Sequence, residues 1–157
     1  MSSKPDGVRR TVPVPTWAEF VYCFDTDVLS ATVRRDPPLH LIRRLARTPP
    51  TEQCTTAITL GELVYGVQRR GSPALAERVQ QLVASAGPIL SFDESAARRY
   101  GQLRADLERV GRRVAEPDLR IAAIVLARGA TLVTGNVRHF AHIPELRIEN
   151  WLVDEPA

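Results

Sequence analysis

Acidic side chains stand close to the ends of several predicted strands. Asp25 directly follows the apolar run 20–24, Glu62 lies about one helical turn after the apolar run 54–58, and Asp118 lies in the first turn of a later predicted helix. Chemistry in an open sheet of parallel strands takes place beyond the carboxyl ends of the strands. We therefore expect these carboxylates to converge on one crevice, where they persist only if cations neutralise them or protons are taken up.

Such a cluster predicts a site for a hard divalent cation. Carboxylate oxygens without a nearby set of His and Cys residues favour Mg²⁺ or Mn²⁺ over zinc. A cation held in this way activates water and stabilises the leaving oxygen when a phosphodiester is hydrolysed. Asp25, Glu62 and Asp118 are therefore the candidate catalytic residues and metal ligands.

Other polar residues near the predicted crevice are further candidates. Glu116 lies two residues before Asp118, close enough in sequence to share a cation or a water molecule with it, and its alternative is a solvated charge at a helix end. Asn136 follows the fourth predicted strand and could ligate a metal through its side-chain carbonyl. Arg138 lies in the loop expected to border the crevice, where its guanidinium could hold a phosphate or remain solvated.

Each acid also has a purely structural explanation. Thr59 and Glu62 have the spacing of a capping box, in which Glu62 would only cap a helix. Asp118 in a first helical turn would interact favourably with the helix dipole. Asp25 or Asp27 would cap the short turn after the first strand. The shared position at strand ends, rather than any single residue, favours a metal site.

The elements that must position these residues alternate between strands and helices. Apolar, β-favouring runs predict strands at 20–24, 54–58, 88–92 and 130–134, with an edge strand at 147–151. Amphipathic segments between them predict helices that begin near Asp36, Thr59, Ser72, Asp93 and Pro117. This alternation predicts an α/β fold with a mainly parallel central sheet of four to five strands and helices on both faces.

Composition limits the class of protein. The chain has 157 residues and a net charge of +3, and Lys4 is the only lysine among its 21 basic residues. Arginine suits RNA or an acidic partner, although a GC-rich genome produces the same bias. Cys23 and Cys54 lie in apolar runs and are predicted to be buried free thiols, in keeping with a reducing cytoplasm. The sequence has no apolar stretch of about 18 residues, so no membrane partner is expected.

Five segments resemble, in order, the sequence blocks of VapC-like PIN-domain toxins of type II toxin–antitoxin systems. The segments are 24–30 (FDTDVLS), 56–67 (TAITLGELVYGV), 118–123 (DLRIAA), 132–140 (LVTGNVRHF) and 148–151 (IENW). The acids of the first three blocks fall on Asp25, Glu62 and Asp118. The resemblance covers residues from about 21 to 152 and predicts a PIN domain over 20–153.

The resemblance implies a three-layer PIN-like fold and an endoribonuclease that depends on Mg²⁺ or Mn²⁺. It also implies a cytoplasmic toxin that forms a homodimer and is held inactive by a VapB-type antitoxin, which we expect to place a basic side chain across the acidic crevice. The sequence departs from the family in the fourth block, where many relatives have an acid at the position of Asn136 or His139. The alternatives are a housekeeping PIN nuclease of RNA processing and a non-catalytic PIN module that binds RNA or protein.

The first nineteen residues are predicted to be a flexible extension. They hold three prolines and show no amphipathic period. A GTG codon at Val21, read as methionine, would give a start typical of the toxins. We therefore expect a chain that starts at position 21 to fold and to cleave RNA.

Overall fold

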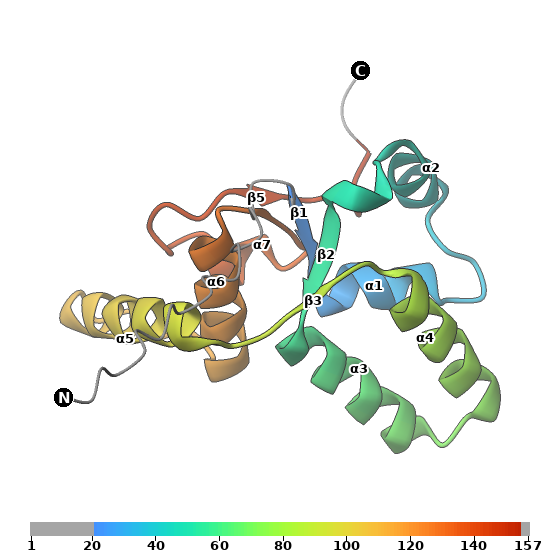
Figure 1. Ribbon diagram of the computed structural model, residues 1–157, viewed down its shortest axis with the longest axis horizontal. Helices are drawn as coiled ribbons and strands as arrows, with labels where there is room; N and C mark the ends of the chain where they lie inside the picture. The colour runs from blue at the N-terminus through green and yellow to red at the C-terminus, as the bar shows by residue number, and fades with distance from the viewer. Residues whose placement is uncertain (1–20, 155–157) are drawn as a thin grey trace, which may run out of the picture.

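The computed structural model describes residues 21–154, which form a parallel sheet flanked by helices (Figure 1). The strands are β1 (Tyr22–Phe24), β2 (Gln53–Thr56), β3 (Ile89–Leu90), β4 (Thr131–Val133) and β5 (Ile148–Glu149). They are ordered β3-β2-β1-β4-β5, and every neighbouring pair is parallel. The predicted α/β fold with a parallel sheet is confirmed, and β1 is its central strand.

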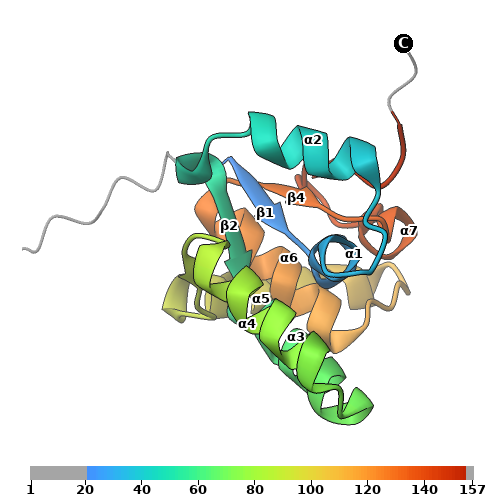
Figure 2. The same cartoon turned by 90° about the vertical axis from the view of Figure 1, so that its right-hand side faces the viewer.

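The helices cover both faces of this sheet. They are α1 (Thr26–Thr32), α2 (Leu39–Arg47), α3 (Ala57–Arg70), α4 (Pro73–Ser85), α5 (Glu94–Arg109), α6 (Glu116–Arg128) and α7 (Val137–Phe140), with a short 3-10 turn at Pro50–Glu52. Figure 2 shows α2 on one side of β1 and β4, and α6 on the other. The molecule therefore has three layers, as the sequence predicts.

Alternation along β1 supplies one core residue to each face. Cys23 packs in a cluster with Leu103 of α5 and Ile124 of α6. The next residue, Phe24, packs in a second cluster with Leu63 of α3 and with Trp151. Successive side chains of a strand point to opposite faces, so a short strand can anchor both cores. Asp25, the next residue, follows the end of the strand and lies beyond the sheet.

Several predicted boundaries differ from the structure. The helix predicted to start near Asp36 begins at Leu39, and Pro38 precedes it without a side-chain cap. The second strand ends at Thr56 rather than at residue 58. The third strand spans only Ile89–Leu90, which pair with Thr55 and Thr56 of β2.

The predicted extension 1–19 lies outside the described residues, as does residue 20. The domain predicted over 20–153 is described from Val21 onward. Among residues 21–154, no helix is both long and apolar enough to cross a membrane. Cys23 and Cys54 are buried free thiols, as predicted.

Candidate active site

Asp25 lies at the carboxyl end of β1, where it is only 4% exposed. Its Oδ1 accepts a hydrogen bond from the backbone N–H of Thr26 at 2.7 Å, and its Oδ2 accepts one from the Thr134 hydroxyl at 2.8 Å. Burial raises the pKa of Asp25, the two hydrogen bonds lower it, and the neighbouring charges of Asp27 and Asp118 raise it. The strand-end position predicted for this acid is therefore observed, with a fixed carboxylate.

Asp27, which the sequence suggested only as a helix cap, is a further member of the site. Its Oδ2 accepts a hydrogen bond from the backbone N–H of Gly135 at 2.8 Å, and its Oδ1 accepts a longer one from the Thr134 hydroxyl at 3.4 Å. A Cβ at Gly135 would lie 2.6 Å from Oδ2 of Asp27, so this close approach requires glycine. Asp27 therefore joins the start of α1 to the loop after β4. Its place two residues after Asp25 was the only sign of this role in the sequence.

Glu62 lies in the second turn of α3. This helix begins at Ala57, and the Thr56 hydroxyl caps it by accepting a hydrogen bond from the Thr59 N–H at 3.1 Å. The capping box suggested for Thr59 and Glu62 is therefore wrong, because Thr59 lies inside the helix. Burial raises the pKa of Glu62, the charges of Asp25 and Asp118 raise it further, and the nearby Thr26 hydroxyl lowers it.

Asp118 lies in the first turn of α6 and is half-buried. Burial raises the pKa of Asp118, the neighbouring His139 lowers it, and the charge of Asp27 raises it. Oδ2 of Asp118 lies 3.2 Å from Nδ1 of His139, an exposed residue of α7. His139 therefore contacts Asp118, a candidate metal ligand, and no local sequence pattern indicated this contact.

Asp25, Asp27, Glu62 and Asp118, which we call the acidic cluster, lie within electrostatic reach of one another at the carboxyl ends of the strands. Asp25, Glu62 and Asp118 each have a pKa that is raised by burial first and then by the charge of another cluster member. Figure 1 shows how this happens, since α1 and α3 start at the ends of β1 and β2. Repulsion of this kind is relieved by a cation or by protons.

The cluster fits a hard cation that keeps part of its water shell. Among residues 21–154, no group of three or more His, Cys, Asp or Glu side chains is placed to hold a metal ion by itself. Mg²⁺ usually binds to one or two carboxylates and shares its remaining positions with water and substrate phosphates. The buried Thr26 hydroxyl lies beside Glu62, where it lowers the pKa of that carboxyl.

Comparison with known proteins gives the family. The PIN domain model matches residues 22–146. The chain is 35% identical to the "tRNA(fMet)-specific endonuclease VapC" of Salmonella typhimurium over 130 residues, which are 83% of this chain and 97% of that protein. It is 30% identical to "Ribonuclease VapC2" of Haemophilus influenzae over 83% of this chain and 98% of that one. The chain belongs to the VapC family of PIN-domain proteins.

A solved structure supports the same assignment. The DNA-bound VapBC of Salmonella typhimurium matches with a TM-score of 0.74 and 34% identity, over 84% of this chain and 98% of that one. The sequence-based prediction of a VapC-like PIN fold is therefore confirmed. Relatives named as ribonucleases also agree with the predicted ribonuclease function. The roles of individual residues in this VapC-family chain remain predictions.

Glu116 is directed away from the acidic cluster of this VapC-family protein. Its carboxylate accepts hydrogen bonds from the Tyr100 hydroxyl at 2.8 and 2.7 Å. It also pairs with Arg104 at 3.3 Å and with Arg120 at 3.4 Å. Residues two apart in a helix do not face the same way, which separates Glu116 from Asp118. The geometry therefore does not support the suggestion that Glu116 and Asp118 share a cation.

Asn136 and Arg138 lie beside the cluster without entering it. Asn136 is exposed, and its backbone N–H donates to the Thr134 hydroxyl at 3.0 Å, so it helps to hold the oxygen that contacts Asp25. Its side chain does not cap α7. Arg138 is exposed and lines a hollow of about 310 Å³ that also includes Asp118. Asn136 as a metal ligand and Arg138 as a phosphate contact therefore stay predictions.

Proposed function

We propose that this VapC-family protein is the toxin of a toxin–antitoxin module and that it hydrolyses RNA phosphodiester bonds with Mg²⁺ or Mn²⁺ held by Asp25, Glu62 and Asp118. The observation that carries the proposal is the convergence of these acids, whose pKa values are raised by burial and by one another's charge. An arrangement that only stabilised helices would not bring acids from three helices together. The relatives named as ribonucleases support the choice of RNA as substrate.

The protein's own residues have distinct parts in this function. Asp25 is fixed by the Thr26 N–H and the Thr134 hydroxyl, so its free electron pairs keep one orientation. Asp27 holds the loop after β4 through the Gly135 N–H. Glu62 and Asp118 supply anionic oxygens from the opposite sides, α3 and α6. A bound cation would activate water and stabilise charge on the leaving oxygen.

Cleavage and cation binding can be measured separately. Purified protein should cleave RNA, lose this activity in EDTA and regain it with Mn²⁺. The same cations should raise the melting temperature of the wild type, which does not depend on any substrate, but not that of Asp25→Asn. Full cleavage in EDTA, or unchanged cleavage after alanine replacement of two of the three acids, would refute the proposal.

Transfer RNA is the first substrate to test. The Salmonella relative is named as an endonuclease specific for tRNA(fMet). We propose structured RNA of this class for the present chain and expect cleavage of initiator tRNA at a defined position. Mapping of RNA 5′ ends after induction in cells checks whether another RNA is cut instead.

A cytoplasmic antitoxin of the VapB type is the proposed protein partner. A hollow of about 500 Å³ lies next to Glu62 and combines apolar residues such as Leu63 and Val79 with Arg34 and Arg70. A segment of the partner seated there could place a basic side chain on the acidic cluster. Co-expression should relieve growth arrest and yield a co-purifying complex, whereas an isolated gene without toxicity would count against this proposal.

The proposed assembly of the toxin is a homodimer. Val64 is 47% exposed and Tyr65 is 65% exposed on α3, which leaves apolar surface available for a second copy. One chain has a mass of 17.4 kDa. Light scattering of the purified protein should give twice this mass. A mass of one chain across the micromolar range would refute the dimer.

A further inference from the structure

Arginines near the α5–α6 end of the molecule differ in whether an acid neutralises them. Arg104 of α5 pairs with Glu108 at 3.1 Å and with Glu116 at 3.3 Å. In contrast, no ion pair among residues 21–154 includes Arg112, Arg113 or Arg138. These three side chains are exposed, so their positive charge faces solvent.

The three unpaired arginines line the same hollow beside the acidic cluster. This space of about 310 Å³, which we call the Asp118 hollow, is bordered by Arg112, Arg113, Arg138, Asp118 and His142. Two of its arginines come from the loop between α5 and α6, and the third comes from α7. Segments distant in sequence therefore bring cations to the edge of the candidate active site.

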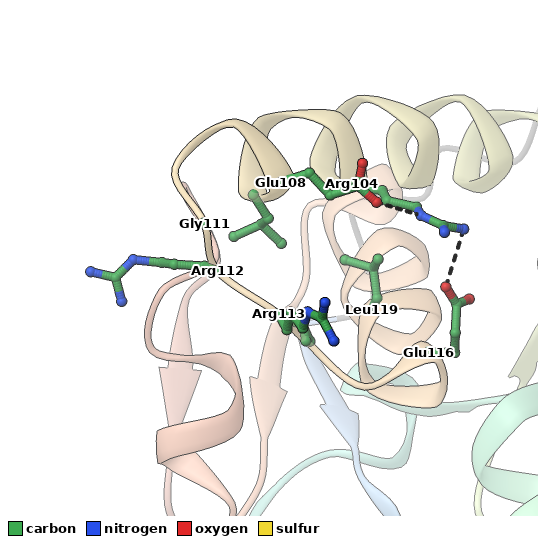
Figure 3. A pocket seen from close by; sticks show the side chains of 9 residues that line it. Arg104, Glu108, Gly111, Arg112, Arg113, Glu116 and Leu119 are labelled. Carbon is green, nitrogen blue, oxygen red and sulfur yellow. Dashed lines mark hydrogen bonds and ion pairs between the residues drawn. The ribbon is translucent and has the colours of Figure 1, made fainter.

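The larger neighbouring hollow shares Arg112 and Arg113 with the Asp118 hollow, but it also holds two acids, Glu108 and Glu116. Figure 3 shows Arg104 joined by dashed lines to Glu108 and Glu116 inside a hollow of about 600 Å³. There the acids neutralise the cation. The same view includes Arg112 and Arg113 among the residues that line this hollow, with the Arg112 side chain pointing outward from the loop. Three arginines therefore face one carboxylate around the Asp118 hollow, whereas three arginines face two carboxylates around the larger one.

An RNA substrate needs such a surface, because the acidic cluster alone repels a polyanion. We propose that Arg112, Arg113 and Arg138 bind RNA phosphates adjacent to the cleaved one and so place the scissile bond at the acidic cluster. This inference rests on the proposed ribonuclease function and names the positioning residues for it. Guanidinium groups match phosphate oxygens in paired hydrogen bonds, and exposed arginines lose little solvation when they bind.

The first test measures RNA affinity without cleavage. In the Asp25→Asn background, labelled initiator tRNA is titrated at several salt concentrations. Each phosphate contact contributes about 0.7 to 0.9 to the slope of log affinity against log salt. The double change Arg112→Gln and Arg113→Gln should therefore lower the slope by roughly 1.4 to 1.8.

A matched control removes the same charge far from the cluster. Arg43 and Arg47 lie on α2, and Arg47 adjoins Thr48, whose carbonyl accepts a hydrogen bond from Gln53 at the start of β2. This places the control at the amino ends of the strands, opposite the acidic cluster. Neither residue takes part in a salt bridge among the described residues. Arg43→Gln with Arg47→Gln should leave the salt slope close to that of the parent.

The second test separates positioning from chemistry. In the otherwise wild-type protein, Arg138→Gln should raise KM for tRNA roughly three- to tenfold and leave kcat within about twofold, and Arg138→Lys should restore part of the loss. If the changes in the Asp118 hollow and the α2 control have equal effects, the inference is overturned. Weaker antitoxin binding with unchanged RNA binding would overturn it as well. A wild type that neither binds nor cleaves RNA would instead overturn the proposed function itself.

Discussion

Neutralising Glu62 should make the metal-free protein more stable even though it impairs the enzyme. Burial and the charges of Asp25 and Asp118 raise the pKa of Glu62, and only the Thr26 hydroxyl opposes them. Among residues 21–154, the Glu62 carboxylate takes part in no salt bridge. The change Glu62→Gln therefore removes repulsion and breaks no ion pair.

The expected gain is modest because Glu62, although partly shielded from water by its neighbours, keeps much of its surface exposed. Interactions between exposed charges amount to about 0.2–1 kcal/mol, so we expect the free energy of unfolding in EDTA at pH 7 to rise by about 0.5–1 kcal/mol. For a domain of this size the melting temperature should then rise by about 1–4 °C. A saturating cation should reverse the order, since ligand at one hundred times its Kd stabilises the wild type by about 2.7 kcal/mol.

The pH dependence of stability independently checks the direction of the Glu62→Gln effect. Folding raises the pKa of Glu62 above its ordinary value of 4.5, so the folded protein keeps the Glu62 proton to a higher pH than the unfolded chain. The stability that Glu62 contributes is therefore present below pH 4.5 and is lost as the pH rises through the folded pKa. The wild type and Glu62→Gln should be equally stable in acid and diverge above that range.

Urea unfolding in EDTA and in Mg²⁺ at several pH values measures these differences. Glu77→Gln is the matched control, because Glu77 is an exposed residue of α4 that forms no ion pair in the described part of the chain. If Glu62→Gln is no more stable than this control in EDTA, the repulsion argument is wrong. If Mg²⁺ stabilises Glu62→Gln as strongly as the wild type, Glu62 is not a ligand.

Three further changes test other parts of the structure. Asp118→Asn should lower cleavage by on the order of 10² or more and remove the stabilisation by Mn²⁺, as measured by single-turnover kinetics and thermal melting. Trp151→Ala should cost about 3–5 kcal/mol in urea unfolding, because Trp151 is 1% exposed and packs against Tyr22 and Phe24, whereas Val153→Ala, at a 58% exposed position, should cost little. A chain with Met in place of Val21 as its first residue should keep the wild-type melting temperature and cleavage rate; a large loss of either would show that residues 1–20 contribute.

The sheet could be predicted because its signals are local. Apolar runs of β-favouring residues marked the first four strands, and Ser72 and Asp93 marked helix starts where the structure has them. Errors arose where one segment suits two conformations. Ala57 and Ile58 continue an apolar run but belong to α3, because the Thr56 hydroxyl caps the helix at that point.

The candidate site was predictable only in part, because it depends on contacts between residues that are far apart in the sequence. Asp25, Glu62 and Asp118 could be found from their places after strands or at a helix start. Asp27 could not, since the groups that give it a role, the Gly135 N–H and the Thr134 hydroxyl, lie more than one hundred residues away.

The misassigned capping box shows why a structural explanation of a residue must be tested by geometry. The spacing of Thr59 and Glu62 fitted a cap, and a cap would have removed Glu62 from the site. Once Thr56 is seen to cap α3, Glu62 has no capping role that accounts for its position next to Asp25 and Asp118. Folding holds this acid where its charge is unfavourable, as expected when a group is kept for binding a cation rather than for stability.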